Sequence, residues 1–203
     1  MKIAVVGASG NAGSRIVSEL ASRGHTVTAI ARHPEKIAAG PNVTPKQGDV
    51  MDQAGLARLF AGHDVAISSV HFLDSDPVRL IGAISDSKVG RYLVVGGAGS
   101  LEVAPGVRLV TIPAFPAQYK AEAEKGGAFL DLLRQEKDLN WTFLSPSALF
   151  VPGERTGKFR LGTDQLLTAA DGKSSISFED FAVALADEIE RPAHIRQRFT
   201  VGY

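Results

Sequence analysis

Apolar runs of strand length alternate with amphipathic segments of helical period along the whole chain. Residues 3–6 form the first apolar run, and a helical stripe through Ile16 and Leu20 follows it. Further strands are predicted at 27–31, 43–47, 65–67, 92–95, 142–144 and 199–201. Further helices are predicted at 55–60, from residue 77, at 117–137 and from residue 178. Near-continuous apolar strands between amphipathic helices predict a parallel sheet covered on both faces.

The third predicted strand contains Pro45, which has no backbone N–H to donate to a neighbouring strand. This strand should therefore lie at a sheet edge, as in the doubly wound strand order 3-2-1-4-5-6. At the last helix, Ser177 is the expected N-cap and Asp180 takes the capping-box position. We predict one α/β domain over residues 1–203, a Rossmann-type doubly wound parallel sheet.

A glycine-rich segment, GASGNAG at residues 7–13, separates the first predicted strand from the first predicted helix. In that context Gly7 suits a tight turn, Gly10 lets a pyrophosphate approach the backbone, and Gly13 lets the helix pack close to the strand. The free N–H groups at the helix start favour phosphates. The segment predicts a dinucleotide site, with contacts from Gly7, Ser9, Gly10, Asn11, Ala12 and Gly13.

The end of the second predicted strand bears on the choice of dinucleotide. It reads Ala31-Arg32-His33-Pro34, without the acidic residue that usually takes the ribose 2′-hydroxyl of NAD. The planar fork of the Arg32 guanidinium suits a 2′-phosphate, and the Ser9 hydroxyl could add a hydrogen bond. His33, the next residue after Arg32, is a further candidate contact. We expect NADP, with NADPH preferred over NADH. The alternative is that Arg32 is a solvated loop residue.

The carboxyl ends of the later strands supply the remaining candidates for cofactor contact. Asp49 and Val50 follow the third strand, where the adenine is expected, although an Asp there is equally typical of a turn. The fourth and fifth strands end in small and polar residues, namely Ser68, Ser69, Val70 and His71, and Gly96 and Gly97. The two glycines leave room for a nicotinamide ring to approach the backbone.

Composition narrows the function classes. The 22 basic and 22 acidic side chains cancel, which argues against a nucleic-acid partner. The absence of cysteine excludes thiol catalysis and disulfides, and the five histidines show no metal-ligand spacing, so we expect no metal site. No apolar run reaches the length of a membrane span. We expect a cytoplasmic monomer or homodimer with no membrane partner.

These motifs resemble the atypical short-chain dehydrogenase/reductase superfamily. The resemblance rests on the 7–13 loop, the turns at 31–36 and 48–50, and the VVGGAGSL segment at 94–101, and it continues through 115–133 and 141–149. Within the superfamily the chain is most similar to the NADH-flavin reductase branch, and to biliverdin reductase B and NmrA-like NAD(P)H-binding proteins. The chain also predicts a small irregular cap at about 146–176, with Pro146 at its start, and the resemblance implies that this segment closes over the nicotinamide site.

The sequence departs from the superfamily's Tyr-x-x-x-Lys centre. If Lys120 takes the lysine position, the tyrosine position falls on Pro116, and Tyr119 points about 100° away from Lys120 on a helix. The usual alcohol-dehydrogenase mechanism is therefore not expected. The candidates for lining the reaction site are Ser100, His71, Tyr119 and Lys120, the last also as a cofactor contact. Lys120 paired with Glu124 on a solvated face is an equal alternative. The alternative for Tyr119 and Ser100 is a role in packing and turn formation, and His71 is most simply a loop histidine.

The resemblance implies an NADPH-dependent reductase that transfers hydride to a flat flavin- or quinone-like acceptor. FMN or FAD would then be a substrate rather than a bound group, and Phe72 and Phe150 would form an apolar wall for it. Two alternatives stay open. One is a non-catalytic NADP(H)-binding redox sensor of the NmrA-like type. The other, which the missing Tyr-x-x-x-Lys disfavours, is a nucleotide-sugar epimerase or dehydratase.

Overall fold

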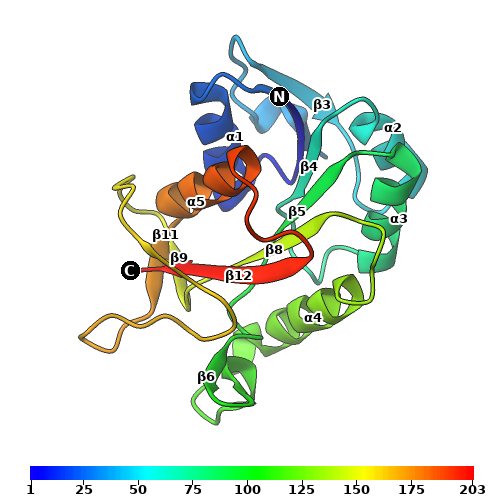
Figure 1. Cartoon of the computed structure of the whole chain (residues 1–203). Helices are drawn as coiled ribbons and strands as arrows, with labels where there is room; N and C mark the ends of the chain where they lie inside the picture. The colour runs from blue at the N-terminus through cyan, green and yellow to red at the C-terminus, as the bar shows by residue number, and fades with distance from the viewer.

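The computed structural model describes all 203 residues and contains one large twisted sheet between two layers of helices (Figure 1). Its eight strands lie in the order β10-β12-β8-β5-β4-β1-β2-β3, and all neighbours are parallel except β10 and β12. These strands are β1 (Lys2–Val6), β2 (Thr26–Ala31), β3 (Val43–Gln47), β4 (Val65–Ser68), β5 (Arg91–Val95), β8 (Trp141–Pro146), β10 (Arg160–Gly162) and β12 (Gln197–Gly202). The predicted doubly wound α/β fold is confirmed.

Two helices cover one face of the sheet and three cover the other (Figure 1). The first layer is α1 (Asn11–Ser22) with α5 (Phe178–Glu190), and the second is α2 (Gln53–Phe60), α3 (Pro77–Ser87) and α4 (Ala117–Leu133). Alternate residues of β1 serve the two layers: Ile3 and Val5 pack in the core under α1 and α5, whereas Ala4 and Val6 pack in the other core. Burial on both faces explains why the central strands β1, β4 and β5 are almost wholly apolar, whereas the edge strands β3 and β10 are not.

Strand β3 occupies the sheet edge, as Pro45 predicts, and Pro45 lies opposite Ala29 of β2. The shorter elements are two 3-10 turns, Pro34–Lys36 and Leu109–Thr111, a hairpin of β6 (Glu102–Ala104) and β7 (Val107–Arg108), and a pair of β9 (Leu149–Val151) and β11 (Ser175–Ser177). Segment 146–176 is therefore not wholly irregular, because it contains β9, β10 and part of β11. None of the helices is long and apolar enough to cross a membrane.

Three carboxylates of α1 and α5 hold residues 152–158, which we call the strap. Glu179 accepts a hydrogen bond from Gly153 N, Glu19 forms a two-point ion pair with Arg155, and Asp180 accepts from Gly157 N. Ser177 caps α5 by accepting from Asp180 N at 2.9 Å, as predicted. The carboxylate of Asp180, however, bonds to the strap and to the Tyr203 hydroxyl rather than closing a capping box.

Candidate functional site

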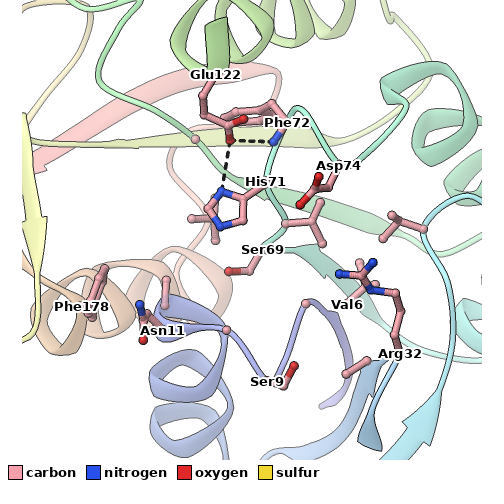
Figure 2. Close-up of a pocket in the computed structure, with 18 of the residues that line it drawn as sticks. Val6, Ser9, Asn11, Arg32, Ser69, His71, Phe72, Asp74, Glu122 and Phe178 are labelled. Atoms are coloured by element: carbon pink, nitrogen blue, oxygen red, sulfur yellow. Dashed lines mark hydrogen bonds and ion pairs between the residues drawn. The ribbon is translucent and has the colours of Figure 1, made fainter. Parts of the chain in front are cut away.

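A groove of about 440 Å³ lies at the carboxyl ends of the central strands, where β1 leads to a helix on one face and β4 to a helix on the other (Figure 2). This is the position at which open α/β sheets bind their ligands. Its lining comprises Val6, Gly7, Ser9, Gly10, Asn11, Ala12, Ala31, Arg32, Gly48, Val50, Ser69, Val70, His71, Phe72, Asp74, Val95, Gly96, Glu122, Phe150 and Phe178.

The 7–13 loop forms the floor of the groove and is built on close backbone contacts. Gly7 has φ +81°, and a Cβ there would lie 2.0 Å from the carbonyl oxygen of Ser69. A Cβ on Gly13 would lie 2.1 Å from the carbonyl oxygen of Gly7. Helix α1 begins after Gly10 with no side-chain cap and no acidic residue in its first turn. Its N–H groups are therefore not neutralised by a carboxylate of that turn, which fits a bound pyrophosphate.

The end of β2 supplies the cation of the groove. Arg32 is exposed, and its side chain lies in the groove beside the loop that carries Ser9 (Figure 2). Ala31, Gly48 and Val50 line the same end without charge. A guanidinium here can bind a phosphate on the ribose of a dinucleotide through two parallel hydrogen bonds.

Aromatic side chains line the opposite end of the groove. Phe150 packs edge-on against Phe178, with ring centroids 4.5 Å apart, and both line the cavity. Phe72 lines it from the other side but is 8% exposed, because its ring packs against Phe129 and Phe143. The two sides together offer an apolar wall for a flat ring.

A carboxylate from α4 reaches the loop after β4. The Glu122 oxygens accept hydrogen bonds from Phe72 N at 2.7 Å and Leu73 N at 2.9 Å, and His71 Nδ1 lies 3.5 Å from one of them (Figure 2). His71 itself is 81% exposed at its side chain and projects into the groove (Figure 2). The groove thus has a cation at the Arg32 end and an imidazole beside a carboxylate at the aromatic side.

The structure brings eleven of the residues singled out from the sequence to the groove. They are Gly7, Ser9, Gly10, Asn11, Ala12, Arg32, Val50, Ser69, Val70, His71 and Gly96. Phe72 and Phe150 line it as well, on opposite sides. These residues come from six separate stretches of the chain, which meet because the carboxyl ends of the parallel strands lie on the same side of the sheet.

Other expected cofactor contacts lie outside the groove lining. Gly13 packs behind the loop against Gly7, and Ser68 is 1% exposed with its hydroxyl 2.8 Å from that of Tyr92. Asp49 accepts a hydrogen bond from Met51 N and lines a second, neighbouring cavity of about 320 Å³. His33 lies exposed, 3.3 Å from Glu35.

The catalytic candidates expected from the superfamily motif also lie outside the groove lining. Ser100 is buried, and its hydroxyl accepts a hydrogen bond from Arg198. Tyr119 is 61% exposed, while Lys120 is exposed and lies about 200° around α4 from Glu122. Pro146 is buried at the end of β8 opposite Val201, and Gly97 does not reach the cavity.

Sequence reasoning missed seven lining residues, namely Val6, Ala31, Gly48, Asp74, Val95, Glu122 and Phe178. Glu122 was detectable, because the stripe of α4 that faces the sheet through Phe129 and Gly126 continues to residue 122 at helical spacing. Its partners, two backbone N–H groups some 50 residues away, carry no sequence signal. No group of three or more potential metal ligands exists in the structure.

Comparison with known proteins gives this geometry a family. Residues 7–192 match the family model described as NAD(P)H-binding. The chain is 40% identical to the uncharacterized protein YwnB of Bacillus subtilis (strain 168), over 99% of this chain and 98% of that protein.

Two of the solved structures that match this chain over its whole length illustrate the family. One is a putative epimerase from Bacteroides thetaiotaomicron, with a TM-score of 0.95, 40% identity and 96% of that chain covered. The other is a putative NADH-flavin reductase from Streptococcus pneumoniae TIGR4, with a TM-score of 0.83, 37% identity and 99% of that chain covered. Both agree with the resemblance to atypical short-chain dehydrogenases/reductases. The chain belongs to the NAD(P)H-binding family.

Proposed function

We propose that the protein is an NADPH-dependent reductase that delivers hydride to a flat flavin- or quinone-like acceptor. The observation that carries the proposal is the continuity of one groove, from Arg32 and the 7–13 loop to the aromatic wall of Phe150 and Phe178. One end of the groove suits phosphates and the other suits a flat ring, and both ends belong to the same cavity. The solved putative NADH-flavin reductase, 37% identical, supports the acceptor class.

The residues of the groove divide the work between binding and orientation. Bound NADPH would supply the hydride, while the loop backbone and Arg32 would hold its phosphates. Val95 and Gly96 at the end of β5 leave a small surface against which a nicotinamide ring fits. Phe150 and Phe178 would stack on the acceptor and exclude water from one side. Positioning of the two rings supplies most of the rate in such a reaction.

The position of α4 weighs against an alcohol dehydrogenase or epimerase. Those reactions in this superfamily use a phenol and an ammonium on one helix face, and neither Tyr119 nor Lys120 lines the groove. A flavin or quinone acceptor does not need that pair, because its ring accepts hydride directly. We therefore place the reductase ahead of the epimerase, although one solved relative is a putative epimerase.

The test is turnover with purified protein, NADPH and a panel of acceptors (FMN, FAD, menadione), followed as loss of absorbance at the nicotinamide band. A reaction without protein and one with NADH in place of NADPH are the controls. We expect faster oxidation of NADPH than of NADH. Tight binding of NADP with no turnover of any acceptor would overturn the proposal in favour of the redox sensor.

A further inference from the structure

We propose that His71, oriented by Glu122, is the proton donor that completes reduction of a quinone-type acceptor. The inference rests on the proposed function and gives it a residue that the superfamily motif does not contain. His71 is here a catalytic residue, since its ring projects into the groove, and Glu122 is a positioning residue that acts through it.

The hydrogen bonds of Glu122 fix the loop from which His71 projects. Its two oxygens accept from Phe72 N and Leu73 N, the two residues that follow His71. Because both N–H groups are held, the backbone at residue 71 is anchored although its side chain is 81% exposed. Gly126, one turn along α4, lets the helix approach, since a Cβ there would lie 2.7 Å from the Phe72 ring.

The ring of His71 presents two nitrogens with different surroundings. Nδ1 faces the Glu122 carboxylate at 3.5 Å, so the opposite edge, with Nε2, is turned away from Glu122 into the groove (Figure 2). A carboxylate facing Nδ1 at this distance favours the tautomer of the neutral ring that carries its proton on Nδ1, which leaves Nε2 as the exchanging nitrogen. The same arrangement orients an imidazolium so that Nε2–H points toward a bound acceptor.

Several charged side chains line the groove around this ring. Besides Glu122 from α4, the charged side chains lining the groove are Asp74, on the same loop, and Arg32, at the end of β2. Figure 2 shows Arg32 on the far side of the groove from Glu122. The Glu122 carboxylate is the one of these that lies within 4 Å of the ring nitrogen Nδ1.

The step balances for a quinone. The reduced nicotinamide would supply a hydride, that is, two electrons and one proton, to the quinone. The other quinone oxygen takes the second proton from His71 Nε2. A new O–H bond forms as the Nε2–H bond breaks, and the products are a hydroquinone and oxidised nicotinamide. The neutral imidazole then regains its proton from solvent, to which it is open. No other oxidant or reductant is required.

The kinetic test compares the wild type with H71Q, E122Q and a matched control, E124Q. Glu124 lies two residues on in the same helix and is exposed, and it does not line the groove. With NADPH and menadione we expect kcat to fall about 100-fold in H71Q and about 10-fold in E122Q, since positioned general acids contribute ~10²–10⁴-fold. The NADPH dissociation constant should stay within about twofold in each variant.

Two readouts separate proton transfer from a structural role. Added imidazole should restore much of the rate of H71A, and the wild-type rate should fall as the pH rises and imidazole loses its proton, a limb that H71Q lacks. In the protein without ligand, ¹⁵N NMR of the neutral ring should show the Nδ1–H tautomer in the wild type and E124Q, and the Nε2–H tautomer in E122Q.

The outcomes are distinguishable. Turnover by the wild type with an unchanged rate and pH profile in H71Q overturns the donor role alone. No imidazole rescue of a folded H71A, or an unchanged tautomer in E122Q, also overturns the assignment. Absence of turnover by the wild type overturns the proposed function and the donor role together.

Discussion

A Cβ added to Gly13 would lie 2.1 Å from the carbonyl oxygen of Gly7, so α1 and the phosphate loop are in direct backbone contact. We predict that Gly13→Ala lowers NADP affinity at least 10-fold, because the loop must move to admit the methyl group. Fluorescence titration with NADPH measures this, and a thermal melt shows whether the variant folds. Gly40→Ala is the control, since nothing lies within 4 Å of its Cβ position. Equal affinities in the two variants would contradict the prediction.

Arg32 should decide between the two nicotinamide dinucleotides. A charged hydrogen bond to a phosphate contributes about 1.5–3 kcal/mol, so Arg32→Ala should weaken NADPH binding at least 10-fold and change NADH binding by less than twofold. Titration of both dinucleotides measures the ratio. Lys36→Ala removes a nearby exposed cation outside the groove and should leave the ratio unchanged. An unchanged ratio in Arg32→Ala would assign the discrimination to other residues.

Ser68 and Ser69 are neighbours with different expected roles. Ser68→Ala leaves the buried Tyr92 hydroxyl without its 2.8 Å partner, which costs about 1–3 kcal/mol in the free energy of unfolding. Because Ser68 does not line the groove, NADPH affinity should stay the same. Ser69→Ala should show the reverse, with weaker NADPH binding and little loss of stability. Urea unfolding and NADPH titration of both variants check the pair; weaker binding in Ser68→Ala would place that hydroxyl in the site.

Acid should weaken the attachment of the strap. Hydrogen bonds from Arg155 hold the pKa of Glu19 below its ordinary 4.5 against the effect of burial, and Arg23 adds to this. The stabilisation is complete above the unfolded pKa and disappears as the pH falls through the lower folded pKa. The free energy of unfolding of Glu19→Gln should therefore be ~2 kcal/mol lower than that of the wild type at pH 7. Its difference from the wild type should shrink below about pH 4. Urea unfolding at both pH values measures it, with exposed Glu35→Gln as control; a pH-independent difference would refute it.

Phe150 should act on the acceptor and not on the cofactor. Its ring is half-buried against Phe178, and Phe150→Ala removes one side of the apolar wall. We expect the menadione KM to rise up to about 10-fold, since one aromatic contact contributes ~0.5–1.5 kcal/mol, with the NADPH dissociation constant unchanged. Steady-state kinetics measure the first and titration the second. An unchanged KM would move the acceptor to another part of the groove.

The parts of the fold that sequence predicted depend on local rules. Pro45 identified the edge strand because a missing N–H has the same consequence in any sheet, and the 7–13 glycines identified the phosphate loop because they lie between a strand and a helix. Helix ends were less predictable: α4 stops at Leu133 rather than at residue 137, since no glycine or proline follows to mark the end.

The parts that escaped prediction depend on contacts between distant segments. Lys120 occupies the lysine position of the superfamily motif in the sequence, but the helical rotation of α4 places Glu122, and not Lys120, in the groove. Ser68 and Ser69 are indistinguishable as letters, and only the alternation of β4 against Tyr92 assigns one to the core and the other to the cavity. Asp180 fits a capping box, yet the strap, more than 20 residues away, takes its carboxylate.

The residues that hold the strap are distinct from the residues that line the groove. The attachments of the strap are carboxylates of α1 and α5, none of which lines the groove, whereas Phe150 lies just before the strap on β9. Residues 148–151 take no part in the hydrogen bonds that hold the strap. If the proposed acceptor stacks on Phe150, substitutions in this four-residue segment would change the contacts of the acceptor and leave the residues of the phosphate loop unchanged.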